Sequence, residues 1–243
     1  MQTINIQPTE KRAEGSGTSL DVQSIFLTLQ GEGPFTGHRA VFVRLAGCNL
    51  QCPSCDTDYT SNRQTMTIEV ILSAIQAAHS HVRSFHIRTL PLVVITGGEP
   101  MRQNLGPLLL SLKHFGFRVQ VETNGTYPIT AQEAFHEWRS VTIVCSPKTG
   151  KVHPTIQALA NCFKYVMSHD SVNPVDGLPM RALNHTASPQ VSRPDNRQLP
   201  IYLQPMDAKD AITNRKNQEA VLESCLKFGY MLQLQTHKLL DIE

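Results

Sequence analysis

Short apolar runs rich in β-branched residues alternate along the chain with segments of helical periodicity. Runs of four to seven such residues are typical of buried strands, whereas apolar positions three and four residues apart are typical of helices that pack on one face. The runs predict six strands, at residues 40–45, 92–96, 118–123, 141–145, 163–167 and 201–204.

Helices are predicted between these strands and after the last of them. In the first helix Thr67 supplies a cap, and Val70, Ile71, Ala74 and Ile75 form an apolar stripe. Repeated strand–helix–strand units are right-handed and give a parallel sheet, so the order predicts an α/β fold, a partial (β/α) barrel of about six parallel strands. In such folds chemistry gathers at the carboxyl ends of the strands. The predicted helices cover residues 68–79, 108–115, 131–138, 155–159 and 207–228.

Two segments interrupt this alternation. Residues 1–19 are polar and contain Gly15-Ser16-Gly17, which predicts a flexible N-terminal extension before a single domain at residues 20–243. Residues 169–200 are rich in Pro, Asn and Asp and have little periodicity. They predict a loop-like insertion that is peripheral to catalysis.

Length and charge narrow the class of protein. A chain of 243 residues is long enough for one large α/β domain, and 40% hydrophobic with 17% charged residues is typical of a globular protein. A net charge of +2 with scattered Lys and Arg predicts no direct contact with nucleic acid. Neither a membrane span nor a signal-peptide core occurs in the sequence, so a cytoplasmic location is expected.

Three of the six cysteines, Cys48, Cys52 and Cys55, fall within eight residues directly after the first predicted strand. In a chain expected to be cytoplasmic this spacing favours metal binding over disulfides. Three thiolates hold three corners of a 4Fe-4S cluster and leave one iron open. Structural zinc would need a fourth ligand, and no Cys or His occurs in the twenty residues after Cys55. Iron–sulfur is favoured and zinc stays an alternative. The isolated Cys145, Cys162 and Cys225 are expected to be buried.

A second motif, Thr96-Gly97-Gly98-Glu99-Pro100, ends the next predicted strand. Its glycines allow a ligand to approach the backbone closely, and Glu99 can accept hydrogen bonds from an ammonium group. Taken alone, a Gly-Gly pair after a strand is commonly only a turn.

Together the two motifs resemble the signature pair of radical S-adenosylmethionine (SAM) enzymes. Further segments, in order along the chain from Ser24, narrow the resemblance to the 7-carboxy-7-deazaguanine synthase family. They are Leu29-Gln30-Gly31-Glu32-Gly33, Arg44-Leu45-Ala46-Gly47, Cys55-Asp56-Thr57, Glu122-Thr123-Asn124-Gly125, Ser146-Pro147-Lys148, Gln204-Pro205-Met206-Asp207 and Gln235-Thr236-His237-Lys238.

The resemblance implies a reaction in queuosine or deazapurine biosynthesis. The open iron binds SAM, and reductive cleavage of SAM gives a 5′-deoxyadenosyl radical that removes a hydrogen from C6 of 6-carboxy-5,6,7,8-tetrahydropterin. Ring contraction with loss of ammonia then yields 7-carboxy-7-deazaguanine, with SAM regenerated and Mg²⁺ assisting. The resemblance further implies an electron donor such as flavodoxin or ferredoxin, and a homodimer.

Roles are implied only where the motifs match. Thr57 corresponds to the Mg²⁺ ligand of the family. Arg44 corresponds to the partner of a substrate carboxylate, and such a partner would offset the cost of burying a cation alone. The C-terminal Glu243 is expected to offer a carboxylate to the aminopyrimidine edge of the pterin; Glu32 and Asp56 receive no role. The implied substrate contacts are Leu29, Gln30, Gly31, Arg44, Thr96, His237 and Glu243. The implied SAM contacts are Gly98, Ser146, Pro147, Lys148, Gln204, Pro205, Met206 and Asp207.

Two other functions stay open. An activating enzyme for a glycyl-radical protein shares the cysteine spacing, although such enzymes usually lack the Leu-Gln-Gly-Glu-Gly segment. A binding module stabilised by zinc or by a cluster needs no Gly-Gly-Glu-Pro motif. Metal analysis separates the module from the enzyme, because one zinc per chain supports the former and about four irons the latter.

Overall fold

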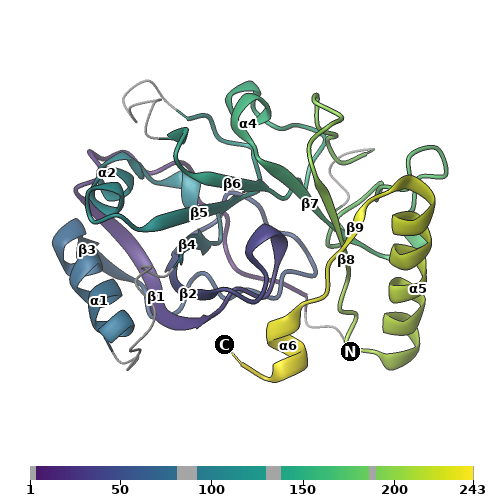
Figure 1. Cartoon of the computed structure of the whole chain (residues 1–243), viewed down its shortest axis with the longest axis horizontal. Coiled ribbons are helices and arrows are strands. Elements are labelled where there is room, and N and C mark those ends of the chain that lie inside the picture. The colour runs from purple at the N-terminus through teal and green to yellow at the C-terminus, as the bar shows by residue number, and fades with distance from the viewer. Residues whose placement is uncertain (1–3, 81–91, 130–137, 186–189, 243) are drawn as a thin grey trace.

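A single mostly parallel sheet organises the chain, which a computed structural model describes at residues 4–80, 92–129, 138–185 and 190–242. Within these residues the sheet has nine strands in the order β3-β1-β2-β4-β5-β6-β7-β8-β9 (Figure 1). Their bounds are β1 Ser19–Leu29, β2 Arg39–Leu45, β3 Gln64–Thr67, β4 Leu92–Gly97, β5 Arg118–Thr123, β6 Thr142–Cys145, β7 Cys162–Met167, β8 Ile201–Pro205 and β9 Met231–Leu232.

The six predicted strands are confirmed as β2 and β4 to β8, which lie side by side and parallel. The predicted strand count was too low, because three further strands extend this sheet at its edges. β1 and β3 add an antiparallel pair beside β2, and the short β9 pairs parallel to β8. The fold is therefore mixed α/β with a mostly parallel sheet.

Helices cover the sheet between the strands and at its end (Figure 1). Their bounds are α1 Ile68–Ser80, α2 Gly106–His114, α4 Pro154–Leu159, α5 Ala211–Phe228 and α6 Thr236–Leu240, with 3-10 turns η1 Gly33–Phe35, η2 Pro100–Arg102 and η4 His169–Ser171. The helix predicted at residues 131–138 lies outside the described residues except for its last position. α5 begins at Ala211, later than predicted, because Asp210 caps it by accepting a hydrogen bond from the Thr213 amide at 2.8 Å.

The apolar stripe predicted for α1 is correct at Ile71 and Ile75, which are fully buried, and wrong at Val70, which is 51% exposed. Ile68 and Leu72 complete the buried face instead. These positions keep the three-and-four spacing of a helix that packs one face on the sheet.

Alternation along β2 separates the core from the site. Val41, Val43 and Leu45 are fully buried in the main apolar cluster, whereas Phe42 and Arg44 point to the other face of the sheet and line a cavity. Successive side chains of a strand face opposite ways, so one strand contributes both to the core and to the cavity wall.

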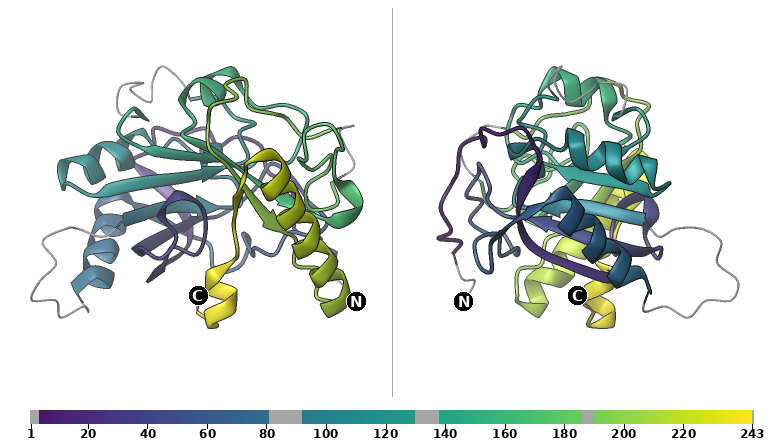
Figure 2. Two further views of the ribbon diagram at one scale, coloured as in Figure 1. Left: turned by 45° about the vertical axis from the view of Figure 1, so that its right-hand side comes forward. Right: turned by 90° about the vertical axis from the view of Figure 1, so that its left-hand side faces the viewer.

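The two segments outside the alternation both contact the cysteine loop (residues 47–60). Residues 4–18 have no regular secondary structure and run as an extended trace along the outside of the molecule (Figure 2). A flexible extension was predicted there, yet the Asn5 amide donates to the Pro53 carbonyl at 3.0 Å. In the insertion, the Leu183 carbonyl accepts from the Ser54 amide at 3.2 Å.

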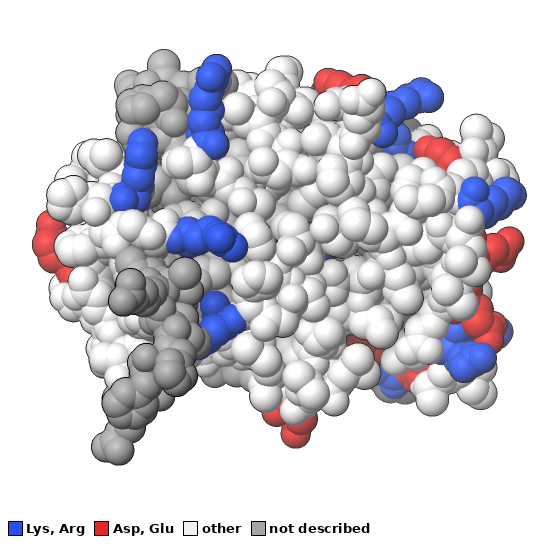
Figure 3. Space-filling view, in the orientation of Figure 1, with Lys and Arg blue, Asp and Glu red and all other residues white. Residues whose placement is uncertain are grey.

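No helix in the described ranges is long and apolar enough to cross a membrane. On the face drawn in Figure 3, charged side chains lie mainly toward the periphery and the centre is largely uncharged.

Candidate active site

The carboxyl ends of the parallel strands meet at one cavity of about 680 Å³, large enough for a small-molecule ligand. The loops after β2, β4, β5, β6 and β8 all contribute to its wall. Among its lining residues are Cys48, Cys52, Cys55, Thr57, Gly98, Asn124, Ser146, Lys148, Met206 and Asp207.

The cysteine loop begins where β2 ends. Its ends are joined by a 2.8 Å hydrogen bond from the Gly47 amide to the Tyr59 carbonyl. Cys48 and Cys52 are buried, Cys55 is half-buried, and none of the three forms a disulfide. Burial raises the pKa of Cys48 to about 12 and that of Cys52 to about 11. These thiols are therefore neutral unless a bound metal displaces their protons.

The arrangement of the three thiols bears on the kind of metal group that the loop could hold. Within the described residues, no three Cys, His, Asp or Glu side chains converge closely enough to ligate one metal ion. A cubane places each of its three protein thiolates on a different iron, so its ligands need not converge on one point. The cysteine loop is therefore compatible with such a cluster.

The Gly97-Gly98 pair lets the end of β4 pack on the cysteine loop. A Cβ on Gly97 would lie 2.1 Å from the Leu45 carbonyl oxygen, and one on Gly98 would lie 2.3 Å from that of Gly47. Larger residues would push the loop away from β4, which explains both glycines. Gly98 lines the cavity as predicted.

Glu99 has a different environment from the one predicted. It is fully buried and does not line the cavity; it accepts hydrogen bonds from the Thr123 hydroxyl at 2.7 Å, the Asn124 amide at 2.7 Å and the Met101 amide at 2.9 Å. Its carboxylate therefore joins the ends of β4 and β5.

Lys148 is a half-buried cation near the cysteines. Its ammonium group donates to the Ser146 carbonyl at 2.7 Å and to the Ser146 hydroxyl at 2.6 Å. Burial lowers the pKa of Lys148, while Cys52 and Cys55 would raise it as thiolates. The Lys148 ammonium group is therefore suited to contact an anionic group bound between the loop after β6 and the cysteine loop.

On the opposite wall, a buried ionic network joins β7 to the loop after β1. The Lys164 ammonium group forms an ion pair with Glu32 and lies 4.0 Å from the Glu122 carboxylate. Burial lowers the pKa of Lys164, but Glu122 and Glu32 together outweigh it and leave that pKa above its ordinary value. Burial raises the pKa of Glu32 and contact with Lys164 lowers it. The net result is a pKa of Glu32 below its ordinary value.

Polar side chains fix Glu122 at the centre of this wall. Its carboxylate accepts from the Gln30 amide at 3.0 Å, the Gln120 amide at 2.9 Å and the Thr96 hydroxyl at 3.3 Å. Gln30 also accepts from the Glu32 backbone amide at 3.1 Å. The wall therefore presents a preorganised carboxylate to a ligand.

Arg44 stands apart from this network. Its guanidinium carbon lies 5.1 Å from the centre of the Phe26 ring, and among the described residues no carboxylate forms an ion pair with it. A cation that lines a cavity without a protein anion is suited to an anionic ligand.

The C-terminal segment closes the cavity from the side of α6. Lys238 donates to Asp56 at 2.7 Å and lies 3.7 Å from Asp207, which ties α6 to the cysteine loop and to the end of β8. A Cβ on Gly31 would lie 2.3 Å from Nδ1 of His237, so the glycine allows that imidazole to approach. Ile242 reaches the cavity, and Glu243 lies outside the described residues.

Comparisons with known proteins place this architecture in a family. Among curated proteins, 7-carboxy-7-deazaguanine synthase of Rhodospirillum rubrum is 39% identical over 240 residues, covering 94% of each chain. The Escherichia coli K12 protein of that name is 33% identical over 239 residues, covering 91% of this chain and 98% of its own. The chain belongs to the 7-carboxy-7-deazaguanine synthase family.

A solved structure agrees with this membership. The crystal structure of QueE from Escherichia coli matches with a TM-score of 0.63 and 25% identity, covering 89% of this chain and 94% of that one. No family model matches the sequence.

Most residues to which the family motifs gave a role lie on one cavity. The structure places on its wall the implied substrate contacts Leu29, Gln30, Gly31, Arg44, Thr96 and His237, the implied SAM contacts Gly98, Ser146, Lys148, Gln204, Met206 and Asp207, and Thr57. Pro147 and Pro205 are not among the lining residues.

Sequence reasoning missed Lys164 and gave no role to Glu32 or Glu122. A signal was present, because Lys164 is the only charged residue in the strand Cys-Phe-Lys-Tyr-Val-Met. A lysine in an otherwise buried strand needs an anionic partner, and the 7-carboxy-7-deazaguanine synthase motifs offer Glu32 and Glu122 for that purpose.

Replacing Lys164 by methionine is expected to destabilise the protein, because two carboxylates would remain buried without their cation. Breaking a buried pair in this way costs about 3–5 kcal/mol, which for a chain of this size lowers Tm by roughly 6–20 °C. Thermal unfolding followed by circular dichroism measures the shift. The control is Arg215→Met, which removes an exposed pair with Glu219 and should lower Tm by less than about 4 °C. Equal shifts in the two variants would contradict a structural role for the buried network.

Proposed function

We propose that the chain converts 6-carboxy-5,6,7,8-tetrahydropterin to 7-carboxy-7-deazaguanine with loss of ammonia, as a radical SAM enzyme of queuosine or deazapurine biosynthesis. The observation that carries the proposal is the single cavity that joins the three cysteines to Arg44 and Glu122. The mostly parallel sheet is compatible with the partial (β/α) barrel of radical SAM enzymes. Activating enzymes for glycyl-radical proteins act on a polypeptide, and the enclosed charged wall around Glu122 suits a small heterocycle better.

Cys48, Cys52 and Cys55 would hold a 4Fe-4S cluster. When bound, the cluster and SAM supply the radical that initiates rearrangement of the substrate. Gly98, Ser146, Lys148 and Asp207 would bind SAM along the wall beside the cysteines, where Lys148 can neutralise a carboxylate. Exclusion of water by the surrounding strand ends would protect the reacting groups.

Two groups of opposite charge would orient the pterin. Arg44 would bind its carboxylate, and Glu122 would accept hydrogen bonds from the N–H groups of its aminopyrimidine edge. Because Glu122 is already fixed by Gln30, Gln120 and Thr96, it would not have to reorganise when the substrate binds.

Anaerobic incubation tests the reaction directly. Reconstituted protein with SAM, Mg²⁺, a reductant and 6-carboxytetrahydropterin should produce 7-carboxy-7-deazaguanine and ammonia, both identified by mass spectrometry and enzymatic assay. A flavodoxin or ferredoxin would replace the chemical reductant in the cell, and a homodimer is the proposed assembly. Cleavage of SAM without any ring-contracted product would contradict the proposed substrate.

Removing the Thr57 hydroxyl is expected to weaken the Mg²⁺ dependence of turnover. Thr57 lines the cavity two residues after Cys55, and Mg²⁺ takes oxygen ligands from few protein groups together with substrate and water. Thr57→Ala should raise the Mg²⁺ concentration for half-maximal rate roughly ten-fold or more, while Thr57→Ser keeps a hydroxyl and stays near wild type. Steady-state rates across a Mg²⁺ titration measure the effect. An unchanged titration in Thr57→Ala would show that the metal is bound elsewhere.

A further inference from the structure

The N-terminal strap, residues 4–13, lies against the outer side of the cysteine loop, away from the cavity. The Asn5 backbone amide donates to the Pro53 carbonyl at 3.0 Å, and its side-chain amide donates to the Cys52 carbonyl at 3.2 Å. Further along, the Glu10 amide donates to the Cys48 carbonyl at 2.7 Å. The strap therefore satisfies the backbone carbonyls of two of the three cysteines.

Gln7 is the central contact of the strap. Its side-chain amide donates to the Thr57 carbonyl at 2.9 Å, and its side-chain oxygen accepts from the Tyr59 backbone amide at 2.8 Å. Its backbone carbonyl accepts from the Gln51 side chain at 2.8 Å. One glutamine thus bonds to both the early and the late part of the loop, much as a paired strand would.

The far end of the strap is anchored to the core. Glu10 forms ion pairs with Arg63 and, at 3.3 Å, with the buried Arg102. Arg102 in turn donates to the Ala46 carbonyl at 3.2 Å, directly before the loop. The strap is consequently attached to the chain on both sides of the cysteine loop, through Arg102 and Arg63.

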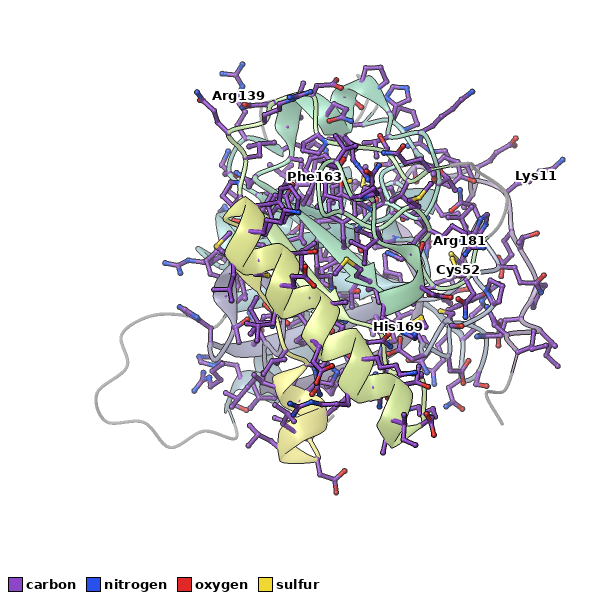
Figure 4. All side chains as sticks on the ribbon, turned by 90° about the vertical axis from the view of Figure 1, so that its right-hand side faces the viewer. Lys11, Cys52, Arg139, Phe163, His169 and Arg181 are labelled. Carbon is purple, nitrogen blue, oxygen red and sulfur yellow. The ribbon has the colours of Figure 1, made fainter. Side chains whose placement is uncertain are left out.

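The loop is held partly by its own bonds and partly by its neighbours. Its residues form no helix or strand, and the described bonds within it include Gly47 to Tyr59 and the 3.1 Å bond from the Cys55 amide to the Cys52 carbonyl. Cys48 and Cys52 are nevertheless only 8% and 6% exposed. In Figure 4, Cys52 lies between the sheet and the N-terminal segment that carries Lys11. The strap contacts the backbone of the loop that carries these thiols.

We propose that the N-terminal strap is a positioning element that holds the cysteine loop in its ligand-binding conformation, with Gln7 as the residue that connects the two. The ligand-binding part of this statement rests on the proposed function; the clamping of the loop does not. Loss of the strap releases the carbonyls of Cys48, Cys52 and Thr57 to water and lets the loop open locally, while the rest of the fold stays closed.

Thiol alkylation of the full-length, metal-free protein tests the clamp. Iodoacetamide is added to wild type and Gln7→Ala, and the modification rate of each cysteine is followed by mass spectrometry. We expect Cys52 and Cys55 to react about ten-fold faster in Gln7→Ala, since two hydrogen bonds to the loop are lost. Fully buried Cys145 should keep its wild-type rate, because it reports opening of the whole fold.

Two further variants sharpen the comparison. Ile6→Ala changes a side chain that is 86% exposed in the same strap and should leave every rate unchanged. Gln7→Glu keeps an acceptor for the Tyr59 amide but has no donor for the Thr57 carbonyl, so its rates should fall between those of wild type and Gln7→Ala.

The outcomes distinguish the positioning role of the strap from the proposed binding of an iron–sulfur cluster. Unchanged rates at Cys52 and Cys55 in Gln7→Ala, or an equal rise at Cys145, would overturn the inference. In reconstituted protein, iron should be lost to a chelator about ten-fold faster from Gln7→Ala than from Ile6→Ala. If alkylation responds as expected but the protein binds no iron, the clamp stands and the proposed function fails.

Discussion

Replacing Cys48, Cys52 or Cys55 by alanine is expected to abolish assembly of the iron–sulfur cluster in each case. In the proposed site each thiol is one of three protein ligands, and two thiolates would not retain a cubane that already has one open iron. Anaerobic reconstitution should give about four irons and four sulfides per chain in wild type and less than about one iron in each variant. Iron and sulfide analysis with visible absorbance measures the loss.

The other cysteines provide matched controls for this experiment. Cys145, Cys162 and Cys225 are buried and lie outside the cysteine loop. Their alanine variants lose a small buried group but no ligand, so iron content and absorbance should match wild type. Loss of iron from Cys225→Ala would sink the ligand assignment, and one zinc per chain in wild type would favour a structural metal site.

The parallel part of the sheet could be predicted from the sequence because its strands are buried on both faces. Such strands appear as continuous apolar runs, as in Leu92–Gly97, and each predicted run was found as a strand. The glycines and cysteines at the strand ends could be located for the same reason, since the end of an apolar run marks the edge where the site forms.

β1 was missed because a bulge reverses its alternation. Leu20 and Val22 are buried, the pairing with β2 shifts between Val22 and Ser24, and Ile25 and Leu27 then pack against the core. The apolar side chains that face the core stand at even-numbered positions before the bulge and at odd-numbered positions after it. No single alternation of period two therefore runs through the whole strand. A search for one continuous apolar–polar alternation therefore cannot detect β1.

The N-terminal strap and the true role of Glu99 depend on tertiary contacts. A polar segment such as residues 4–13 looks solvated in sequence, because the carbonyls that it satisfies belong to a loop 38 to 50 residues away. Glu99 sits in a ligand-binding motif, yet it bonds to Thr123 and Asn124 across the sheet. Local pattern cannot reveal which partner a polar side chain finds at long range.

The insertion contacts the site at one point. Residues 169–200 were expected to be peripheral to catalysis, which stays a prediction; Leu183 lines the cavity, and the Asn184 side chain donates to the Ser54 hydroxyl at 2.7 Å. Leu183 and Asn184 both have positive φ, of 50° and 58°. A backbone conformation that disfavours leucine is maintained where the insertion meets the cysteine loop, which indicates that this contact is specific.

Replacing Arg44 by methionine is expected to lower kcat/KM for 6-carboxytetrahydropterin roughly 30- to 3,000-fold. Truncating one member of a desolvated charge pair costs about 2–5 kcal/mol, and each 1.4 kcal/mol is a factor of ten. Arg44 has no anionic partner among the described residues, so its charge is available to a ligand. Arg44→Lys should recover only part of the loss, because an ammonium group cannot make the two parallel bonds of a guanidinium.

The cavity geometry explains why this effect should fall on substrate rather than on the fold. Arg44 lies over the Phe26 ring, which is stacked on Phe42 at 5.4 Å, so the guanidinium is held in place by aromatic side chains of β1 and β2. Methionine preserves most of the aliphatic packing and removes a cation that forms no ion pair among the described residues, so no described anion loses its partner. Tm, iron content and SAM binding should therefore remain close to wild type.

A substrate analogue that lacks the 6-carboxyl group isolates the interaction. Wild type should bind this tetrahydropterin far more weakly than the natural substrate, whereas Arg44→Met should bind the two with similar affinity, as measured by competition. The matched control is Arg39→Met, at the start of the same strand, where the guanidinium contacts His79 and does not line the cavity. That variant should retain the wild-type preference for the carboxylate. If Arg44→Met also retains it, the carboxylate is bound by another residue, and the proposed orientation of the pterin between Arg44 and Glu122 is wrong.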